Sequence, residues 1–307
     1  MDIRQLRYFL AVASERSFTR GAERLNMAQP PLSRRVQDLE IELGVKLFDR
    51  ESRPLKLTPA GQLLLEQGSQ VVQRMDQLHA TMSRFVAGQK TRFAIGLVPS
   101  TMYSRFVDVI RLFRDRAPNV DLRLYEMDTL EQVAALRDGR INAGFDRIRV
   151  DDATLRHQVL REEGLVGVLP AEHPRLADPR PLELEELAAL PLIVYPREPR
   201  PSYADAVLAL FAERGLTPLE VHEVRELQTA MVMVAAGAGA SVVPESVRRL
   251  GRPDVGFLDL ATAQTIPIML RTRVDEQSPA LDVLYAALGE LYRDMGLPAP
   301  TRPDDEV

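Results

Sequence analysis

One apolar repeat constrains this chain more than any other feature of its sequence. Large apolar side chains recur at seven-residue spacing with a second set interleaved: Leu64, Val71, Met75, Leu78, Met82 and Phe85. The helix that carries them is predicted for residues 59–88, because Thr58 is a suitable N-cap and Pro59 suits the first helical turn. An apolar seam is unstable in water alone, so we expect this dimerisation helix to pair with the same helix of a second copy.

Composition limits the classes of protein to which the chain can belong. Its 307 residues suffice for two or three domains, and neither a secretory signal nor a membrane-spanning apolar run is evident. There is no cysteine, and the four histidines are not spaced as metal ligands. We therefore expect a cytoplasmic protein that uses no metal and no cofactor.

The net charge of −5 is unevenly distributed along the chain. Residues 1–58 contain eleven Lys and Arg against eight Asp and Glu, which leaves them at +3 and the remainder at −8. A basic N-terminal part on an acidic body fits nucleic-acid contact at that end. A charge difference of this size also arises by chance, so nucleic-acid contact must be judged from the motifs.

Residues 1–58 are predicted to form a helix-turn-helix followed by a wing. Apolar residues at helical spacing indicate three short helices. The third of them has one apolar face, made of Leu32, Val36, Leu39 and Leu43. Gly44 is expected to end this helix, and alternation over residues 46–57 indicates a short hairpin as the wing.

The polar face of the third helix suits the major groove of DNA. Four residues share that face: Pro30, Ser33, Arg34 and Gln37. Arg can bond to guanine or phosphate, Gln can bond to adenine, and Ser reaches either. On the wing, Arg50, Arg53 and Lys56 are placed to reach phosphates or the neighbouring minor groove. The alternative is an ordinary solvated face on a small helical bundle.

Residues 89–300 are predicted to form an α/β domain with two halves. Strand and helix patterns alternate from residue 92 and again from residue 164, which argues for parallel sheets. The first half is assigned residues 92–163 and 268–300, because the last helix is expected to pack back onto it, and the second half is assigned residues 164–267. Two such halves are typical of clefted, periplasmic-binding-protein-like domains that bind an effector between them.

Polar residues are expected to line the cleft between these halves. Two predicted strands end just before helices, one at Pro99-Ser100-Thr101 and one at Thr129. Free helix N–H groups and hydroxyls should then face one crevice and attract a carboxylate. Arg147 is placed to add positive charge, and across the cleft lie Pro201, Ser202 and Tyr203. The alternative for Ser100 and Thr129 is that they only cap helices.

Four segments, taken in order, resemble the winged helix-turn-helix of the LysR-type transcriptional regulators: LRYFLAVA, SFTRGAERLNMAQPPLSRRVQDLE, LGVKLFDR and LTPAG. The resemblance covers the whole chain, because the α/β halves match that family's effector domain. It implies that Arg53 approaches the minor groove of DNA. The residues implied to approach the major groove are Gln29, Pro30, Pro31, Ser33 and Arg34. It also implies a homotetramer on pseudo-palindromic promoter DNA, ligand-dependent DNA bending, and RNA polymerase as a partner.

Within that family the chain resembles the regulators of aromatic catabolism that respond to cis,cis-muconate or benzoate. The matching segments are LVPSTMY, DTLEQ, GFDRIRV, IVYP with RPSY, VRELQ and VAAGAGASVVP. Carried over, the resemblance implies that Ser100 and Thr129 hold one carboxylate. The rest of the implied pocket is Arg147, Pro201, Ser202 and Tyr203. The chain departs from the pattern at Pro99, which lacks an N–H donor, at Asp128, which adds an acid, and at Tyr203, which replaces a Phe.

The sequence thus predicts a transcription regulator controlled by a small anionic organic acid, either muconate-like or an aromatic carboxylate. Two alternatives stay open: a small-molecule-binding protein without a DNA function, and a regulator of the same family in another metabolic pathway. An enzyme is not expected, because the sequence has no Ser-His-Asp order, nucleophile elbow, P-loop or metal cluster.

Leu78→Lys tests the predicted seam. A charged side chain in the middle of an apolar helix pair is poorly solvated, so the variant is expected to be monomeric by light scattering. A variant that remains dimeric would show that the copies associate through other surfaces.

Overall fold

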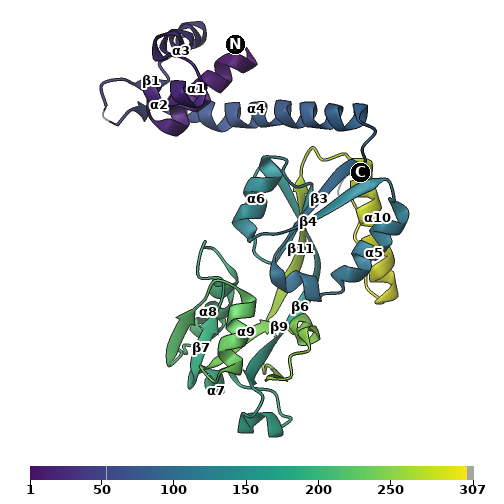
Figure 1. Ribbon diagram of the computed structural model, residues 1–307. Helices are drawn as coiled ribbons and strands as arrows, with labels where there is room; N and C mark the ends of the chain where they lie inside the picture. Colours follow the sequence, from purple (N-terminus) through teal and green to yellow (C-terminus); the bar gives the residue numbers. More distant parts are fainter. Residues whose placement is uncertain (53, 303–307) are drawn as a thin grey trace. The chain divides into compact units, whose positions relative to one another are not determined.

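A computed structural model gives the fold of residues 1–52 and 54–302. The chain divides into two compact units, Met1–Gln89 and Lys90–Val307, and each is described by itself (Figure 1). Unit 1 is helical apart from a two-stranded wing, and unit 2 is α/β, which confirms the predicted fold class. Arg53, which was predicted to approach DNA, lies outside the described residues.

Unit 1 is a helix-turn-helix with a wing and a long last helix. Its elements are α1 (Ile3–Glu15), α2 (Phe18–Arg24), α3 (Gln29–Leu43), β1 (Phe48–Asp49), β2 (Lys56–Leu57) and α4 (Pro59–Val86). The Ser17 hydroxyl caps α2 by accepting from the Arg20 N–H at 3.3 Å. Gly44 ends α3 in the left-handed conformation at φ 69°, as predicted.

One hydrophobic core joins the helices of unit 1 to its wing. Phe9 and Val12 of α1 and Leu32 and Val36 of α3 are fully buried in it. The ring of Phe48, from the wing strand β1, lies 5.3 Å from the ring of Phe9. The wing is therefore packed into the same core that orients α3.

A buried carboxylate also ties the wing to α3. Glu40 is 2% exposed, and its Oε1 accepts from the N–H groups of Leu47 at 2.9 Å and Phe48 at 3.3 Å. Its Oε2 lies 3.2 Å from Arg50 Nη2 and 3.4 Å from Lys46 Nζ. Burial by itself raises the pKa of Glu40, but these donors outweigh burial and lower the pKa below its ordinary value of 4.5. The charged form of Glu40 thus stabilises the wing.

The start of α4 is docked on the wing. The Thr58 hydroxyl donates to the Lys46 carbonyl at 2.7 Å and accepts from the Gly61 N–H at 3.0 Å, which confirms Thr58 as the N-cap. A Cβ at Gly61 would lie 2.0 Å from the Leu47 carbonyl oxygen. Only glycine allows this close approach, so the packing of α4 on the wing explains the glycine of the Thr-Pro-Ala-Gly segment.

The apolar seam of α4 is exposed over most, but not all, of its predicted length. Leu64 is half-buried and packs on the core of unit 1, so only part of its side chain is open to the predicted seam. Five residues remain exposed and form what we call the α4 stripe: Val71, Met75, Leu78, Met82 and Phe85. Phe85 is 77% exposed, which is unusual for so large an apolar side chain and fits the predicted association surface.

Unit 2 is built on one hydrogen-bonded sheet of nine strands among the described residues. The strands are β3 (Thr91–Leu97), β4 (Val120–Glu126), β5 (Ala143–Asp146), β6 (Leu155–Pro170), β7 (Pro191–Val194), β8 (Glu220–Glu223), β9 (Ala240–Pro244), β10 (Val255–Asp259) and β11 (Thr265–Arg273). Their order is β4-β3-β5-β11-β6-β9-β7-β8, with β10 beside β6. The predicted parallel pairing holds for β3 with β4 and β5, and for β7 with β8 and β9.

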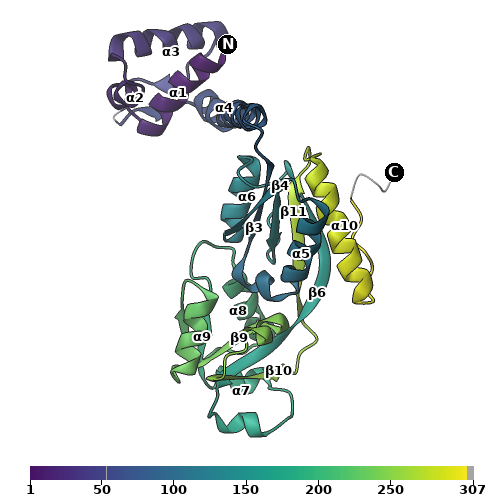
Figure 2. The same cartoon turned by 45° about the vertical axis from the view of Figure 1, so that its right-hand side comes forward.

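The long strand β6 runs through both halves of unit 2 (Figures 1 and 2). Its first part pairs antiparallel with β11, and its last part pairs antiparallel with β9 and β10. The predicted boundary between residues 163 and 164 therefore falls inside a continuous strand. β10 and β11 are missing from the sequence prediction. In β11, Arg271 and Arg273 are buried, which a hydropathy pattern does not reveal.

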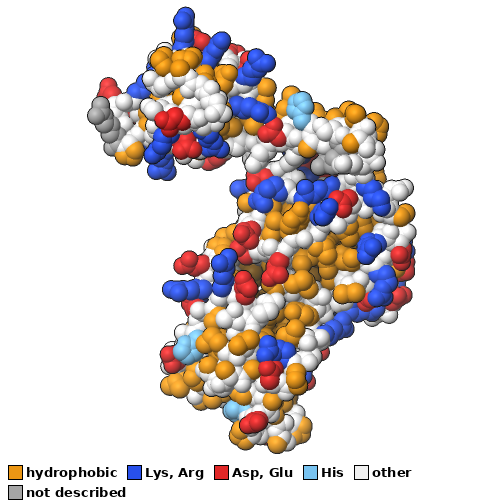
Figure 3. All heavy atoms as spheres, in the orientation of Figure 1, with side chains coloured by type: hydrophobic (Ala, Val, Ile, Leu, Met, Phe, Trp, Pro, Cys, Tyr) orange, Lys and Arg blue, Asp and Glu red, His pale blue; other side chains and the backbone are white. Residues whose placement is uncertain are grey.

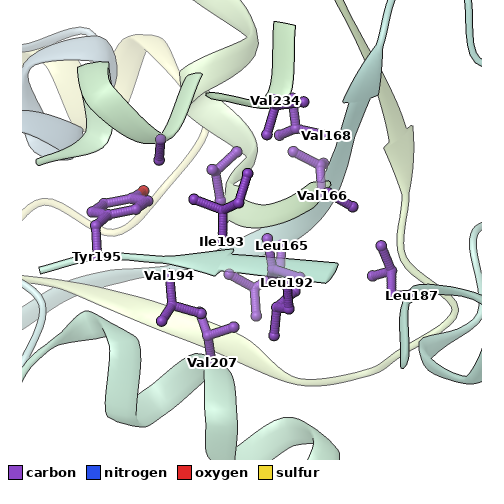
Figure 4. Packing of buried hydrophobic residues seen from close by; sticks show 14 of the residues in the cluster. Leu165, Val166, Val168, Leu187, Leu192, Ile193, Val194, Tyr195, Val207 and Val234 are labelled. Atoms are coloured by element: carbon purple, nitrogen blue, oxygen red, sulfur yellow. The ribbon is translucent and has the colours of Figure 1, made fainter. Parts of the chain in front are cut away.

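Helices cover the strands of both halves. Those of the first half are η1 (Pro99–Tyr103), α5 (Phe106–Arg116), α6 (Thr129–Arg137) and α10 (Pro279–Asp294), where η denotes a 3-10 helix. Those of the second half are η2 (Pro174–Ala177), α7 (Leu184–Ala188), α8 (Tyr203–Glu213), α9 (Leu227–Ala235) and η3 (Glu245–Leu250). The last helix α10 shares a core with α5 and β3, so it packs onto the first half as predicted. In the second half Leu192, Ile193 and Val234 lie in one cluster (Figure 4).

Glu40→Gln is expected to loosen the wing, because an amide accepts more weakly than the carboxylate. The free energy of opening that protects the Leu47 and Phe48 amides against hydrogen exchange should fall by about 1–3 kcal/mol at neutral pH. Since the folded-state pKa is lowered, the stabilisation is complete above the ordinary pKa of 4.5 and is lost as the pH falls through the lowered value. Wild type and variant should therefore converge in acid. The exposed Glu23→Gln is the control, and equal protection in Glu40→Gln and wild type at pH 7 would contradict this role.

Candidate functional site

The predicted DNA-contacting face of α3 is presented to solvent. Of the six residues assigned to it, all but Ser33, which is half-buried, are exposed: Gln29, Pro30, Pro31, Arg34 and Gln37. Leu32 and Val36 on the opposite face are fully buried, so the rotation of α3 about its axis is fixed. Arg35, which the sequence analysis did not select, is exposed beside them.

Arg50 also takes part in the structure of unit 1. Its guanidinium bonds to the buried Glu40 and lies 5.1 Å from the centre of the Phe18 ring. Arg50 thus helps to neutralise Glu40, but the residue is exposed, and its predicted contact with DNA stays a prediction.

A cavity of about 920 Å³ opens in unit 2, within the range typical of small-molecule sites. Six of the seven residues predicted to bind an effector line it: Ser100, Thr129, Arg147, Pro201, Ser202 and Tyr203. They come from both halves of unit 2, as the sequence predicted. In Figure 3, side chains of both charge signs gather across the middle of this unit.

The seventh residue, Thr101, is not among the residues that line the cavity. It is 1% exposed, and its hydroxyl donates to the Val98 carbonyl at 2.8 Å within η1. Its predicted role in effector binding is thus not supported, because the hydroxyl is used to close a turn.

Arg147 is the centre of a buried polar network at the cavity. It is 3% exposed, its Nε donates to Ser100 Oγ at 2.9 Å, and its Nη2 donates to Glu163 Oε2 at 2.7 Å. Glu163 lies in β6 and also accepts from the Ser246 N–H of η3 at 2.5 Å. Burial by itself raises the pKa of Glu163, but Arg147 and Ser246 outweigh burial and lower it. Glu163 therefore stays charged and links the two halves.

A second buried ion pair holds the segment that carries Arg147. Asp146 Oδ2 accepts from Arg271 Nε at 2.9 Å, and both side chains are fully buried. The other nitrogens of Arg271 donate to the carbonyls of Val150 at 2.7 Å and Ile148 at 3.1 Å. The chain from residue 146 to 150 is thereby fixed, and the position of Arg147 with it.

The predicted attraction of a carboxylate to two helix N-termini is contradicted for one helix and stays a prediction for the other. The helix predicted to start just after Thr101 begins only at Phe106, and the turn between is the short 3-10 helix η1. At the N-terminus of α6, Asp128 accepts from the Glu131 N–H at 2.8 Å, which occupies one of the four N–H groups that a helix start leaves free. The negative charge of Asp128 opposes a second anion at this end. The side chain of Arg147 is a further donor at the cavity.

The second half contributes Ser202, Tyr203 and one residue that the sequence prediction missed, Tyr195. Ser202 Oγ donates to the Pro196 carbonyl at 3.0 Å, and the Tyr203 hydroxyl lies 3.4 Å from the Val242 carbonyl. Tyr195 lines the cavity at the end of β7 and is 6% exposed. The Tyr-Pro pair of the IVYP segment was its only signal in the sequence.

Acids dominate the remaining lining of the cavity. They are Glu126, Asp128, Glu131, Glu198, Glu223 and Glu226, against Arg197 and Arg225. Glu163 pairs with Arg147 and offsets its charge. What the cavity provides for an anion is therefore directed hydrogen-bond donors, and less so a net positive charge.

Two further properties limit the chemistry of the described residues. Within residues 1–52 and 54–302, no group of three or more His, Asp or Glu side chains is arranged to hold a metal ion. None of the described helices combines the length and the apolar character needed to cross a bilayer.

Comparison with known proteins gives relatives that match over nearly the whole chain. The probable cat1 operon transcriptional activator of Acinetobacter lwoffii is 42% identical over 96% of this chain and 97% of its own length. The regulator CatR of Pseudomonas putida is 44% identical over 91% of this chain and 95% of its own length. The regulator BenM of Acinetobacter baylyi is 37% identical over 98% and 99%, respectively.

Solved structures of similar proteins give the same picture as the sequence relatives. The BenM effector binding domain with its effector benzoate is similar at a TM-score of 0.64 and 32% identity, over 70% of this chain and 97% of that chain. Full-length CbnR complexed with its target DNA is similar at a TM-score of 0.66 and 29% identity, over 94% and 98%.

Two family descriptions account for both units. Residues 3–62 match the bacterial regulatory helix-turn-helix protein, lysR family, and residues 87–293 match the LysR substrate binding domain. The exposed face of α3 and the cavity of unit 2 lie within these two matches. The chain belongs to the LysR family of bacterial transcriptional regulators.

Proposed function

We propose that this regulator binds promoter DNA through α3 and is controlled by a small organic acid that binds in the cavity of unit 2, without any further cofactor. The observation that carries the effector part is Arg147. Its guanidinium is buried at a cavity of about 920 Å³, and its Nη1 has no hydrogen-bond partner among the described residues. A buried donor without an acceptor is unfavourable, and a carboxylate would remove that penalty.

The DNA part rests on the presentation of α3. Arg34 and Gln37 are exposed on the side of the helix opposite its buried apolar face. This is the arrangement by which a recognition helix enters the major groove. The similarity of unit 1 to the family's helix-turn-helix and the structure of CbnR on its target DNA support the same assignment.

The α4 stripe supports association of two copies. Its exposed apolar residues follow the spacing of a helix that pairs with another helix. A dimer would present two copies of α3 to half-sites about one DNA turn apart, roughly 34 Å. We extend this to a homotetramer on promoter DNA in the cytoplasm, where RNA polymerase is its partner.

The effector class follows from the cavity and from the relatives. Arg147 and the hydroxyls of Ser100 and Thr129 suit a carboxylate, and the apolar parts of Tyr195 and Tyr203 suit a flat or unsaturated carbon skeleton. BenM has a structure with its effector benzoate. Benzoate and cis,cis-muconate are therefore the first candidates.

Arg34→Ala tests the DNA part. With DNA selected from a random-sequence pool by the wild-type protein, the variant should bind about 1–3 kcal/mol more weakly in fluorescence anisotropy, because one contact to base or phosphate is lost. The exposed Arg114→Ala of α5 is the matched control. If affinity and salt dependence are the same as for wild type, Arg34 does not contact DNA.

The carboxylate site is tested by thermal shift against small mono- and dicarboxylic acids. An acid that binds the folded protein raises the melting temperature by mass action. The double variant Ser100→Ala with Thr129→Ala should lose most of that shift. Thr101→Val should keep it, because the Thr101 hydroxyl is bonded within η1. A full shift in the double variant would remove these hydroxyls from the site, and no shift in wild type with any acid would refute the effector class.

A further inference from the structure

One buried amide in the first half of unit 2 has no part in the proposed function. Gln132 of α6 is fully buried, and it is not among the residues that line the cavity. Its Nε2 donates to the Met127 carbonyl at 3.1 Å and to the Phe145 carbonyl at 3.2 Å. A buried amide is unfavourable unless it is hydrogen-bonded, so these two acceptors show where the side chain acts.

The two acceptors lie on strands that are not neighbours in the sheet. Met127 follows β4 and Phe145 lies in β5, and β3 runs between these strands. The ladders of β3 with both strands end at Leu97, which lies opposite Glu126 on one side and Phe145 on the other. The Gln132 amide therefore joins the ends of β4 and β5 directly, at the point where the ladders stop.

Two glycines make room for this side chain. Gly96 of β3 and Gly144 of β5 are paired in register, and neither is in the left-handed region. A Cβ at Gly96 would lie 2.7 Å from Ile141 Cδ1 and 3.1 Å from Gln132 Cγ, and a Cβ at Gly144 would lie 2.5 Å from Gln132 Oε1. These positions require glycine for space and not for backbone conformation, and at Gly144 the amide occupies that space.

The surroundings of the amide determine its direction. With nitrogen and oxygen exchanged, the oxygen would face two carbonyl oxygens, which repel it. As the amide stands, Oε1 lies beside Gly144 and has no hydrogen-bond partner among the described residues. An unpartnered buried oxygen is unfavourable, so what Gln132 contributes is the pair of bonds from its nitrogen.

Each acceptor of the Gln132 amide lies two residues before a residue of the proposed carboxylate site. Met127 precedes Thr129 in this way, and Phe145 precedes Arg147. Both Thr129 and Arg147 line the cavity. Because so short a stretch of chain follows each bonded carbonyl, the amide controls how far apart these two residues lie.

The end of β3 is tied to the same point. The Val98 N–H donates at 3.1 Å to the Phe145 carbonyl, the oxygen that also accepts from Gln132. Ser100, the third residue of the proposed carboxylate site, follows Val98 by two residues. All three strand ends that carry this site are thus joined at the acceptors of one amide.

We infer that Gln132 is a positioning residue of the effector site, whose amide sets the separation of Thr129 and Arg147 without touching the effector. The inference rests on the proposed function and adds a residue that acts only through the backbone. Affinity for a small acid depends on how well its donors are held in place. Loosening this link should therefore weaken binding although every side chain that lines the cavity is kept.

Gln132→Met tests the inference, because the thioether keeps the length of the side chain and removes both donors. The full-length protein is titrated calorimetrically with benzoate and with cis,cis-muconate, at a temperature where circular dichroism shows each variant fully folded. The acids that wild type binds should bind the variant about tenfold more weakly, which corresponds to about one hydrogen bond. The control is Thr272→Val, which removes a buried hydroxyl from β11 in the same half and should leave the affinities unchanged.

A second pair of variants separates positioning from a general loosening of this half. Gly144→Ala keeps Gln132 but displaces its amide, because the added Cβ would lie 2.5 Å from Oε1, so it should also weaken binding about tenfold. In Gln132→Ala the amide is absent and the same methyl group has room. Adding Gly144→Ala to Gln132→Ala should therefore cost no further affinity.

Four results would overturn the inference, and they differ from one another. Equal affinity in Gln132→Met and wild type means that the strand ends keep their places without the amide, while the proposed function stands. Losses that add in the double variant mean that Gly144→Ala acts by another route. Equal weakening in Thr272→Val means that any buried change in this half disturbs the site. If wild type binds neither acid, the proposed effector class fails together with the inference.

Discussion

The contacts that neutralise one buried guanidinium, that of Arg147, hold the two halves of the ligand-binding unit together. Arg147 cannot stay buried without acceptors, and it finds them in Ser100 of the first half and in Glu163 on the strand that runs through both halves. Glu163 in turn accepts from Ser246 of the second half. This chain of contacts leaves one buried nitrogen of Arg147 without a partner among the described residues, in a residue that lines the cavity.

The DNA-binding unit uses the same physical device for another purpose. Glu40 is a buried carboxylate whose acceptor capacity is filled by two backbone N–H groups of the wing and by Arg50. In both units a buried carboxylate is tolerated because it is paired with an arginine and accepts backbone N–H groups. Glu40 fixes the wing relative to the recognition helix, and Glu163 fixes the two sides of the cavity. The family assignment places Glu40 in the helix-turn-helix match and Glu163 in the substrate-binding-domain match. It also confirms that the chain is a regulator and not an enzyme.

Local features of the structure were predictable from the sequence, and long-range ones were not. Gly44 and Thr58 act through neighbours a few residues away, so spacing alone revealed their roles at the ends of helices. Glu163 acts through partners that the fold brings together, and Tyr195 reaches the cavity only through the fold, so no periodicity marks either residue. The contacts of Leu64 with the core of unit 1 and of Arg50 with Glu40 were not predictable either, because the heptad and the basic wing say nothing of how unit 1 packs. Six cavity residues were found through family resemblance and strand ends, although the α-helix expected just after Ser100 starts only at Phe106.

We propose that the carboxylate of the effector binds at Arg147 Nη1. A crystal structure of the full-length protein with benzoate would show this contact. We expect a carboxylate oxygen within about 3.2 Å of Nη1, with the bonds from Arg147 to Ser100 and Glu163 intact. Benzoate bound elsewhere, or an ordered water on Nη1 with the carboxylate out of hydrogen-bond range, would contradict it.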